Sequence, residues 1–403
     1  MRTPTKKLWR FMKSDQKLKV GLVFDDSLDS NDGVAQYVKT LGRWLSDQGH
    51  TVSYIVGETK MKSWAGGGVY SLSKNLKVQF NGNSLSVPLL ASRTSISNAL
   101  ADKDPDVLHI MMPHSPLMAQ RVINRASNRT AVIGTFHVFP ASWSARYGGK
   151  LLRLSYGRGL GRFNSFVSVS AAAQSYAKKS FGIESEIIPN PVRVSSFSSS
   201  NTKPEPNKIV FLGRLVKRKG CEQLIEAFSL LSAKIPDARL VIAGDGQQRQ
   251  YLELKAKKLN IGANVKFLGF IDESNKPDLL ASASVACFPS LYGESFGIVL
   301  IEAMAAGSRT VLGGDNPGYR TVLGDQPELL VDPTNKQKFA EQLEKLLTDK
   351  RLVEKLHEWQ INSLEQYDIQ TVGERIVNLY RSSIASQAKN SHNDAHGIQK
   401  SNS

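Results

Sequence analysis

The sequence predicts an α/β protein made of two doubly wound domains in tandem. Short β-rich runs alternate with amphipathic segments along nearly the whole chain of 403 residues. This alternation needs crossover connections, and therefore parallel sheets with helices on both faces. A Ser/Pro-rich stretch at residues 194–207 separates two such series, and the length suits two domains of about 150 to 200 residues each.

Each series contains several apolar runs rich in β-branched residues, which is typical of buried strands. In the first series these are residues 19–25, 51–57, 107–112, 131–136, 166–170 and 186–189, and in the second 208–213, 239–244, 265–269, 285–289 and 309–313. Amphipathic helices are predicted between them, among others at 33–47, 221–231 and 247–259. Because ligands bind beyond the carboxyl ends of such strands, we expect the functional site in the cleft between the two domains.

These elements divide the chain into six segments. We expect a basic leader (1–18), an N-terminal domain (19–193), a linker (194–207), a C-terminal domain (208–365), a helix that returns to the N-terminal domain (366–385) and a disordered tail (386–403). In the leader, Trp9 and Phe11 stand among lysines and arginines, which fits either a disordered segment or a peripheral membrane anchor.

The composition is that of a soluble globular protein and excludes several other classes. No run of about 18 apolar residues occurs, so no conventional transmembrane helix is expected, and the N-terminus lacks the apolar core of a secretory signal. Cys221 and Cys287 lie in apolar patterns, which indicates reduced packing residues of a cytosolic protein rather than a disulfide or a metal site.

Charge is distributed unevenly along the chain. Nearly all of the net charge of +16 lies in the first half, and residues 107–183 contain no Asp or Glu at all. Solvated faces, an anionic membrane surface, an acidic substrate or nucleic acid would each account for such an excess. Nucleic-acid binding is the weaker hypothesis, because the basic segments lack a recognition helix and the aromatic residues do not form a stacking platform.

The most informative segment is PSLYGESFGIVLIEAMAAG, residues 289–307, which follows a predicted strand and opens a helix. We expect Phe296, Gly297 and Ile298 in its first turn, where backbone N–H groups can receive a phosphate or a sugar hydroxyl. Glu294 in the preceding loop and Glu302 inside the helix can both face one ligand, and a carboxylate is the usual partner of ribose hydroxyls.

A second segment, FLGRLVKRKG at residues 211–220, combines a strand end, a cationic turn and a helix start. Its four cations are Arg214, Lys217, Arg218 and Lys219. Guanidinium and ammonium groups at this place would neutralise a diphosphate through charge-assisted hydrogen bonds, each worth roughly 1.5–3 kcal/mol.

These segments resemble those of the family-4 glycosyltransferases of GT-B fold, and in particular the bacterial phosphatidylinositol mannosyltransferases. The resemblance is strongest at GESFGIVL and EAMAAG in the second half and extends, with DVLHI, GTFH and IIPN, from about residue 19 to 381. It implies two doubly wound Rossmann-like domains facing across a cleft. It also implies transfer of a sugar from a nucleoside diphosphate donor, with retention of anomeric configuration and without an essential metal.

The resemblance assigns roles on the donor side residue by residue. Arg214 and Lys219 would bind the donor diphosphate, and Glu302 would take the ribose hydroxyls. Ile271 would be a further donor contact. The turn that holds the transferred sugar and the β-phosphate would consist of Glu294, Ser295, Phe296, Gly297 and Ile298.

On the other side of the cleft, the resemblance implies that Gly33, at the start of the first helix, lets backbone N–H groups approach the phosphates, and that His137 contacts the sugar. Asp32 precedes Gly33 where the family often has a second glycine, and an Asp there caps the helix but repels phosphate. Met111 and Met112 stand where relatives commonly show His and Glu.

Together these features predict a retaining hexosyltransferase without a metal or other cofactor, whose first expected donor is GDP-mannose, with a UDP-sugar close behind. Catalysis would rest on stabilising the departing diphosphate, so that its oxygen can take the acceptor's proton. We expect a lipid acceptor and a peripheral position on the cytoplasmic face of the membrane. A soluble polysaccharide or polyol acceptor, a non-catalytic nucleotide-sugar sensor and a nucleic-acid-binding protein are the alternatives.

Overall fold

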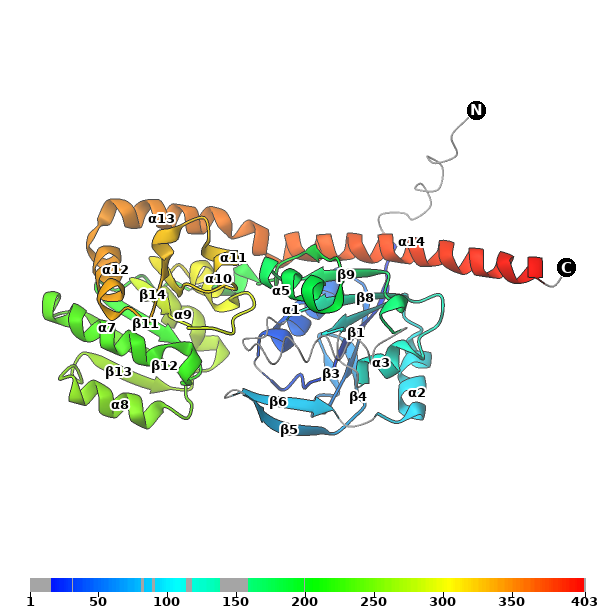
Figure 1. Ribbon diagram of the computed structural model, residues 1–403, viewed down its shortest axis with the longest axis horizontal. Helices are drawn as coiled ribbons and strands as arrows, with labels where there is room; N and C mark the ends of the chain where they lie inside the picture. Colours follow the sequence, from blue (N-terminus) through cyan, green and yellow to red (C-terminus); the bar gives the residue numbers. More distant parts are fainter. Residues whose placement is uncertain are drawn as a thin grey trace, which may run out of the picture.

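The computed structural model describes residues 16–30, 32–80, 83–88, 91–113, 118–137, 159–198 and 200–401. Two sheets form the centres of two α/β domains that lie side by side (Figure 1). Most of the basic leader, and with it the possible membrane anchor, lies outside the described residues, as does much of the acid-free span.

The first sheet has eight strands in the order β10-β9-β8-β7-β1-β2-β4-β3, all parallel except for β3, which runs antiparallel to β4. Its strands are β1 (Lys19–Phe24), β2 (Thr51–Val56), β3 (Ser63–Trp64), β4 (Gly67–Ser71), β7 (Val107–Met111), β8 (Ala131–Phe136), β9 (Ser165–Ser168) and β10 (Glu186–Ile187). An antiparallel hairpin, β5 (Asn75–Phe80) and β6 (Asn83–Pro88), forms a separate sheet. The hairpin and the β3–β4 pair are not among the predicted strands.

Helices cover both faces of this sheet. Alternate residues of each strand point to opposite sides, and the apolar residues on each side pack against helices. Leu22 and Phe24 of β1 pack in the cluster that contains α1 (Gly33–Asp47) and the last helix. Val23 packs in the cluster that contains α2 (Arg93–Lys103) and α3 (Met118–Ile123). A further helix, α5 (Ala171–Tyr176), follows β9.

The second sheet is entirely parallel, in the order β13-β12-β11-β14-β15-β16. The strands are β11 (Lys208–Leu212), β12 (Arg239–Ala243), β13 (Val265–Gly269), β14 (Val285–Phe288), β15 (Thr310–Gly314) and β16 (Leu330–Val331). The helices of this domain are α7 (Cys221–Lys234), α8 (Arg249–Lys258), α9 (Lys276–Ala281), α10 (Ile298–Ala306), α11 (Arg320–Leu323), α12 (Lys336–Thr348) and α13 (Lys350–Ser363). Cys221 and Cys287 are free and fully buried in its core.

The predicted linker contains a helix. Residues Val194–Phe197 form α6, and the half-buried Phe197 packs on the core of the second domain. Ser200 Oγ donates a hydrogen bond to Asp278 Oδ1 at 2.6 Å. The described part of the linker is therefore fastened to the second domain.

The last helix, α14 (Ile369–Ser401), runs back along the first domain (Figure 1). Its residues Ile369, Val372, Ile376 and Tyr380 are buried in the cluster around α1 and β1. Tyr380 OH lies 2.7 Å from Nδ1 of the buried His109, and burial lowers the pKa of His109 to about 3. The helix continues to Ser401, so the segment after residue 385, expected to be disordered, is helical in the structure.

Each sheet has one place where the strand order reverses. In the second sheet β12 and β13 follow β11 on one side, while β14, β15 and β16 lie on its other side, so the reversal falls between β11 and β14. In the first sheet it falls between β1 and β7. Ligands of doubly wound sheets bind at the carboxyl ends of the strands at such a point.

Candidate active site

Two loops meet at the reversal in the second sheet. The loop after β11 passes through the short 3-10 helix Lys217–Lys219 to Gly220, which has φ +73°. A Cβ on Gly220 would stand 1.9 Å from the carbonyl oxygen of Pro289 in the loop after β14. Leu291 N donates to Arg218 O across the same junction at 2.8 Å. A glycine is therefore required for the close contact of the two loops.

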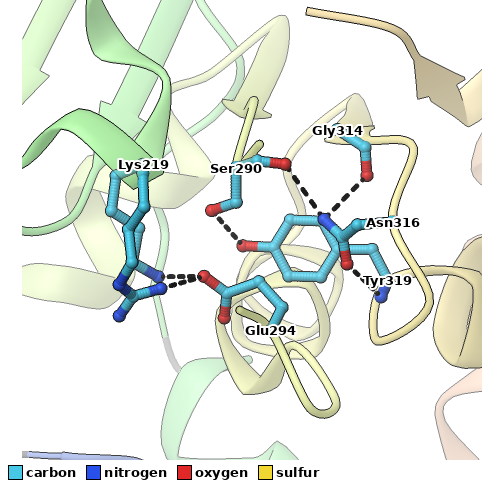
Figure 2. A network of polar contacts seen from close by, with 7 residues as sticks. Lys219, Ser290, Glu294, Gly314, Asn316 and Tyr319 are labelled. Atoms are coloured by element: carbon cyan, nitrogen blue, oxygen red, sulfur yellow. Dashed lines mark hydrogen bonds and ion pairs between the residues drawn. The ribbon is translucent and has the colours of Figure 1, made fainter. Parts of the chain in front are cut away.

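This contact brings the cationic turn to Glu294. Arg218 Nη1 and Lys219 Nζ donate to the same carboxylate oxygen, Glu294 Oε1, at 2.9 Å and 2.8 Å (Figure 2). The three side chains are only 12%, 18% and 13% exposed. Lys217 belongs to the same turn but is exposed. Within residues 217–219, Arg218 and Lys219 thus point to Glu294, whereas Lys217 is exposed to solvent.

The electrostatics of the cluster favour a bound anion. Burial would raise the pKa of Glu294, but Lys219 and Arg218 outweigh it and leave this pKa below its ordinary value. Burial lowers the pKa of Lys219, and Arg218 and Arg214 lower it further against the opposing effect of Glu294. Arg214 is also close enough to Arg218 and Glu294 to feel both charges. Arg218 and Lys219 thus share one carboxylate, and the exposed Arg214 adds a third positive charge near Glu294 and Asp32, which leaves excess positive charge.

Next to this cluster, α10 begins with an uncapped end. Gly297 is its N-cap at φ +110°, no side chain caps it, and its first turn has no acidic residue. The helix begins at Ile298, two residues later than expected. Phe296 is 1% exposed and packs edge-on to Tyr367 at 5.9 Å, so its ring anchors the loop and only its backbone can meet a ligand. The helix start thus offers backbone N–H groups and positive dipole charge to an anion.

A turn between β15 and α11 is hydrogen-bonded to this loop (Figure 2). Asn316 Nδ2 donates to the carbonyl oxygens of Ser290 and Gly314 at 3.0 Å and 3.1 Å, and its Oδ1 accepts from Tyr319 N at 3.0 Å. Ser290 Oγ lies 3.2 Å from Tyr319 OH. The fully buried Tyr319 ring fills the space beside Gly297, where a Cβ would come within 2.6 Å of it.

Glu302, one turn into α10, is paired with a lysine. Lys276 Nζ lies 3.0 Å from both carboxylate oxygens, and Glu302 is 8% exposed. Burial raises the pKa of Glu302 against the effect of Lys276. Burial alone would lower the pKa of Lys276, but Glu302 and Glu273 together raise it. Ile271, half-buried, lies in the loop between β13 and α9.

The first domain places its own helix start opposite α10. A Cβ on Gly33 would lie 3.5 Å from Ile298 Cδ1, so the starts of α1 and α10 are in contact. Asp32 Oδ1 accepts from Val34 N at 2.8 Å and from Ala35 N at 3.0 Å. The resemblance implies that N–H groups at Gly33 meet phosphate, but in the structure the carboxylate of Asp32 already takes the two that follow it.

His137 lies directly after β8 and is buried, with 5% of its surface exposed. Its ring stands edge-on to Tyr37 of α1, with centroids 4.6 Å apart, and Nε2 is 3.3 Å from Met111 Sδ. Tyr37 and Met111 therefore fix the orientation of the ring at the reversal in the first sheet.

Most of the predicted site residues thus lie near the carboxyl ends of the strands at which the order of each sheet reverses, between β11 and β14 and between β1 and β7. Three supporting residues were missed: Lys276, Asn316 and Tyr319. Arg218 was predicted only as one of the four cations of its segment, without a role of its own, and Asn316 carried a local signal in the loop GGDNPG after a parallel strand. Lys276 had none, because only the fold brings it to Glu302.

The triplet Asp104-Pro105-Asp106 places two carboxylates close together in the sequence, as in some metal sites. In the structure both carboxylates have structural roles. Asp104 ends α2 in the left-handed region, and Asp106 Oδ2 accepts from Lys19 N at 2.8 Å. Within the described ranges, no three His, Cys, Asp or Glu side chains form a cluster that could hold a metal ion. No helix in this part of the chain has the length and apolarity needed to cross a bilayer.

The chain is similar to known proteins over most of its length. Residues 31–196 match glycosyltransferase family 4, and residues 193–365 match the glycosyl transferases group 1. The phosphatidyl-myo-inositol mannosyltransferase of Mycolicibacterium smegmatis is 30% identical over 377 residues, covering 90% of this chain and 93% of that protein. Its counterpart in Mycobacterium tuberculosis is 30% identical over 391 residues, covering 92% and 99%.

Solved structures agree in fold. HepE of Anabaena, in complex with UDP and glucose, has a TM-score of 0.71 at 16% identity, covering 91% of this chain and 100% of that one. A glycosyltransferase of Rickettsia africae has a TM-score of 0.70 at 16% identity, covering 91% and 99%. The chain is a glycosyltransferase and belongs to the family-4 glycosyltransferases of GT-B fold.

Proposed function

We propose that this glycosyltransferase moves a hexose, with mannose from GDP-mannose as the first expectation, to a membrane-lipid acceptor with retention of anomeric configuration. The observation that carries the proposal is the cation excess at the β11–β14 reversal. Arg218 and Lys219 share the carboxylate of Glu294, and Arg214 is close enough to feel its charge, beside the uncapped start of α10. A nucleoside diphosphate sugar presents two negative phosphates, which is the charge this cluster lacks.

Binding of the donor would change the partners of the cations. Lys219 and Arg218 share one oxygen of Glu294, so each can turn part of its hydrogen-bonding capacity to phosphate oxygens. Glu294 would then remain beside the sugar. Glu302, together with Lys276, would take the ribose hydroxyls. The supporting turn of Asn316 and Tyr319 would hold the loop in place during this exchange.

Catalysis would consist mainly of electrostatic stabilisation. Arg214 and Lys219 would stabilise the charge that grows on the diphosphate as the glycosidic bond breaks, and removal of one such donor typically costs about 10²–10³ in turnover. The departing phosphate oxygen would accept the proton of the acceptor hydroxyl on the same face of the sugar, which retains the configuration. No metal is required for this step.

The lipid acceptor rests on the relatives and on charge. The relatives quoted above are named for transfer to phosphatidyl-myo-inositol, and at about 1 kcal/mol per basic residue a basic surface would hold the enzyme at an anionic membrane face. We therefore propose a peripheral location on the cytoplasmic face of the membrane.

A thermal-shift screen tests the donor. The protein is melted with GDP-mannose, UDP-glucose, UDP-N-acetylglucosamine, GDP and UDP, each without metal and again with Mg²⁺. A ligand at about 100 times its dissociation constant adds about 2.7 kcal/mol to the free energy of unfolding. We expect a shift with the guanine series and no added shift with Mg²⁺.

A transfer assay tests the acceptor and the stereochemistry. The donor that binds is incubated with vesicles that contain phosphatidylinositol, or with free inositol, and the anomeric configuration of the product is determined. Product on the lipid with retained configuration supports the proposal. A shift only with the uracil series, product only on the soluble acceptor, or inverted configuration would each contradict the corresponding part.

A further inference from the structure

A cluster of buried polar side chains lies between β7, β8 and α14 in the first domain. It consists of His109, Thr135 and Tyr380, each at most 1% exposed. Tyr380 OH lies 2.7 Å from His109 Nδ1, and Thr135 Oγ1 lies 2.5 Å from Nε2. Burial keeps this imidazole neutral, since it lowers the pKa of His109 to about 3. A neutral ring has one donor and one acceptor nitrogen, so both nitrogens are used within the cluster.

The cluster is adjacent to the ring of His137. Thr135 lies in β8 two residues before His137, which follows the strand directly, so the two side chains leave the chain on the same face. Tyr37 of α1 covers that face, and its ring stands edge-on to His109 at 6.1 Å and to His137 at 4.6 Å between centroids. Burial raises the pKa of the Tyr37 hydroxyl, and the nearby hydroxyl of Thr135 opposes this rise. Tyr37 is therefore in contact with both the cluster and His137.

Apolar packing restrains a ring less sharply than hydrogen bonds do, because hydrogen bonds between buried groups have a preferred direction. We propose that Thr135 and His109 are positioning residues of the candidate active site. Held by Tyr380, they orient the Tyr37 ring, and this ring in turn orients His137. The last helix of the chain thereby takes part in the geometry of the site. The inference rests on the proposed contact of His137 with the transferred sugar.

Two substitutions of Thr135 separate orientation from packing. Thr135→Val keeps the shape of the side chain but removes the hydroxyl that meets His109. Thr135→Ser keeps the hydroxyl but leaves a gap of one methyl group. If the cluster only fills the core, the serine variant should disturb the site at least as much as the valine variant. If the cluster orients His137, the valine variant should disturb it more.

The nitrogen-15 signals of the histidine rings report orientation without any substrate. In the full chain, the signals of His137 are those that vanish in His137→Ala. We expect them to shift in Thr135→Val and to keep their positions in Thr135→Ser. The matched control is His50→Gln, which removes a buried histidine whose Nδ1 accepts from Leu18 N at 3.0 Å before the start of β2, at the other end of the strands. Unchanged His137 signals in Thr135→Val, or an equal shift in His50→Gln, would overturn the proposal.

Donor turnover connects this orientation with catalysis. Hydrolysis without acceptor is measured for the nucleoside diphosphate sugar that raises the melting temperature most among those named above. We expect Thr135→Val to lower kcat roughly 10- to 100-fold with little change in KM, and Thr135→Ser to stay within about threefold of wild type. The second domain holds the diphosphate in each case, which is why KM should change little.

A double variant shows whether the effect passes through His137. In the His137→Ala background, Thr135→Val should lower kcat no further, since both changes act through one ring. A full additional loss in this background would overturn the proposal. Wild-type turnover in His137→Ala would overturn the sugar contact on which the inference rests. A loss in His137→Ala together with wild-type turnover in Thr135→Val would overturn the positioning alone.

Discussion

The starts of α1 and α10 are the same structural element placed in two domains, yet they are finished in opposite ways. Each opens a helix after a strand at the reversal of its sheet, and the two are in contact through Gly33 and Ile298. The carboxylate of Asp32 caps α1 and takes two of its N–H groups. The start of α10, at Gly297, has no side-chain cap and lies beside the cations of the β11 loop.

The difference assigns the two domains different tasks. An uncapped helix start with nearby cations accepts an anion, whereas a start with a carboxylate repels one. The donor diphosphate therefore belongs to the second domain. At its own helix start the first domain presents the carboxylate of Asp32, and nearby the buried ring of His137, which suits contact with a sugar or an acceptor hydroxyl more than with phosphate.

The largest expected effect comes from Arg214, a cation to which the resemblance assigns the departing diphosphate. Arg214→Ala should reduce turnover by roughly 10²–10³ while leaving the fold intact, because it removes stabilisation that grows in the transition state. Steady-state kinetics with the donor from the screen measures it. Lys217→Ala, in the same cationic segment and exposed like Arg214, is the control and should retain turnover. Equal turnover in both variants would remove Arg214 from the mechanism.

A side chain placed at the uncapped start of α10 should lower both stability and donor affinity. In Gly297→Ala the new methyl group meets the Tyr319 ring at 2.6 Å at φ +110°, whereas Gly307→Ala, at the other end of the helix, carries a similar strained φ of +89° with nothing within 4 Å. Both should lose roughly 1–3 kcal/mol of stability. Only Gly297→Ala should lose donor affinity, by about tenfold or more, as measured by calorimetry. A comparable loss of affinity in Gly307→Ala would show a general effect of stability.

The pH dependence of donor binding follows from Lys219, whose pKa lies below that of an ordinary lysine because of burial and neighbouring cations. Phosphate prefers the protonated ammonium group, so donor binding takes up protons. Donor affinity has its full value at pH values below the pKa of Lys219 in the free protein. It falls as the pH rises through this pKa, by up to about tenfold per pH unit. In Lys219→Arg, which stays charged, this fall should vanish. A fall that persists unchanged would assign the titration to another group.

The smallest effect is expected in the first domain. Asp32→Asn keeps a side chain that can cap α1 but removes the charge that faces the donor site. Donor affinity should rise about two- to fivefold, the size of one charge acting on a helix end, with little change in melting temperature. Asp32→Ala separates the two roles, since it should also lose about 1 kcal/mol of stability. A fall in affinity in Asp32→Asn would contradict the division between the two helix starts.

The alternation of strands and helices could be predicted from the sequence because buried parallel strands form continuous apolar runs. The β5–β6 hairpin carries no comparable apolar run, and its strands are not among the predictions. The end of α14 was also missed, since its polar composition indicates disorder. A helix that is already nucleated by the packed residues before it can nevertheless continue without the cost of a new start.

In the site, motif residues were predictable and their partners less so. The cationic turn was visible as a whole, but only the 3-10 turn at residues 217–219 decides that Arg218 and Lys219 point to Glu294 and Lys217 to solvent. Lys276 lies 26 residues from Glu302, a separation that only the packing of α9 against α10 closes. Sequence patterns record a residue's own element, whereas ion pairs depend on how elements pack.

Calorimetric titration of the nucleoside diphosphate selected by the screen, on wild type, Lys219→Ala and Lys217→Ala, tests the assignment of the donor site most directly. The two lysines lie in one turn, and one is bonded to Glu294 while the other is exposed. We predict that Lys219→Ala weakens binding about tenfold or more and that Lys217→Ala stays within about twofold of wild type. Equal affinities in the two variants would contradict the placement of the diphosphate at the β11–β14 reversal.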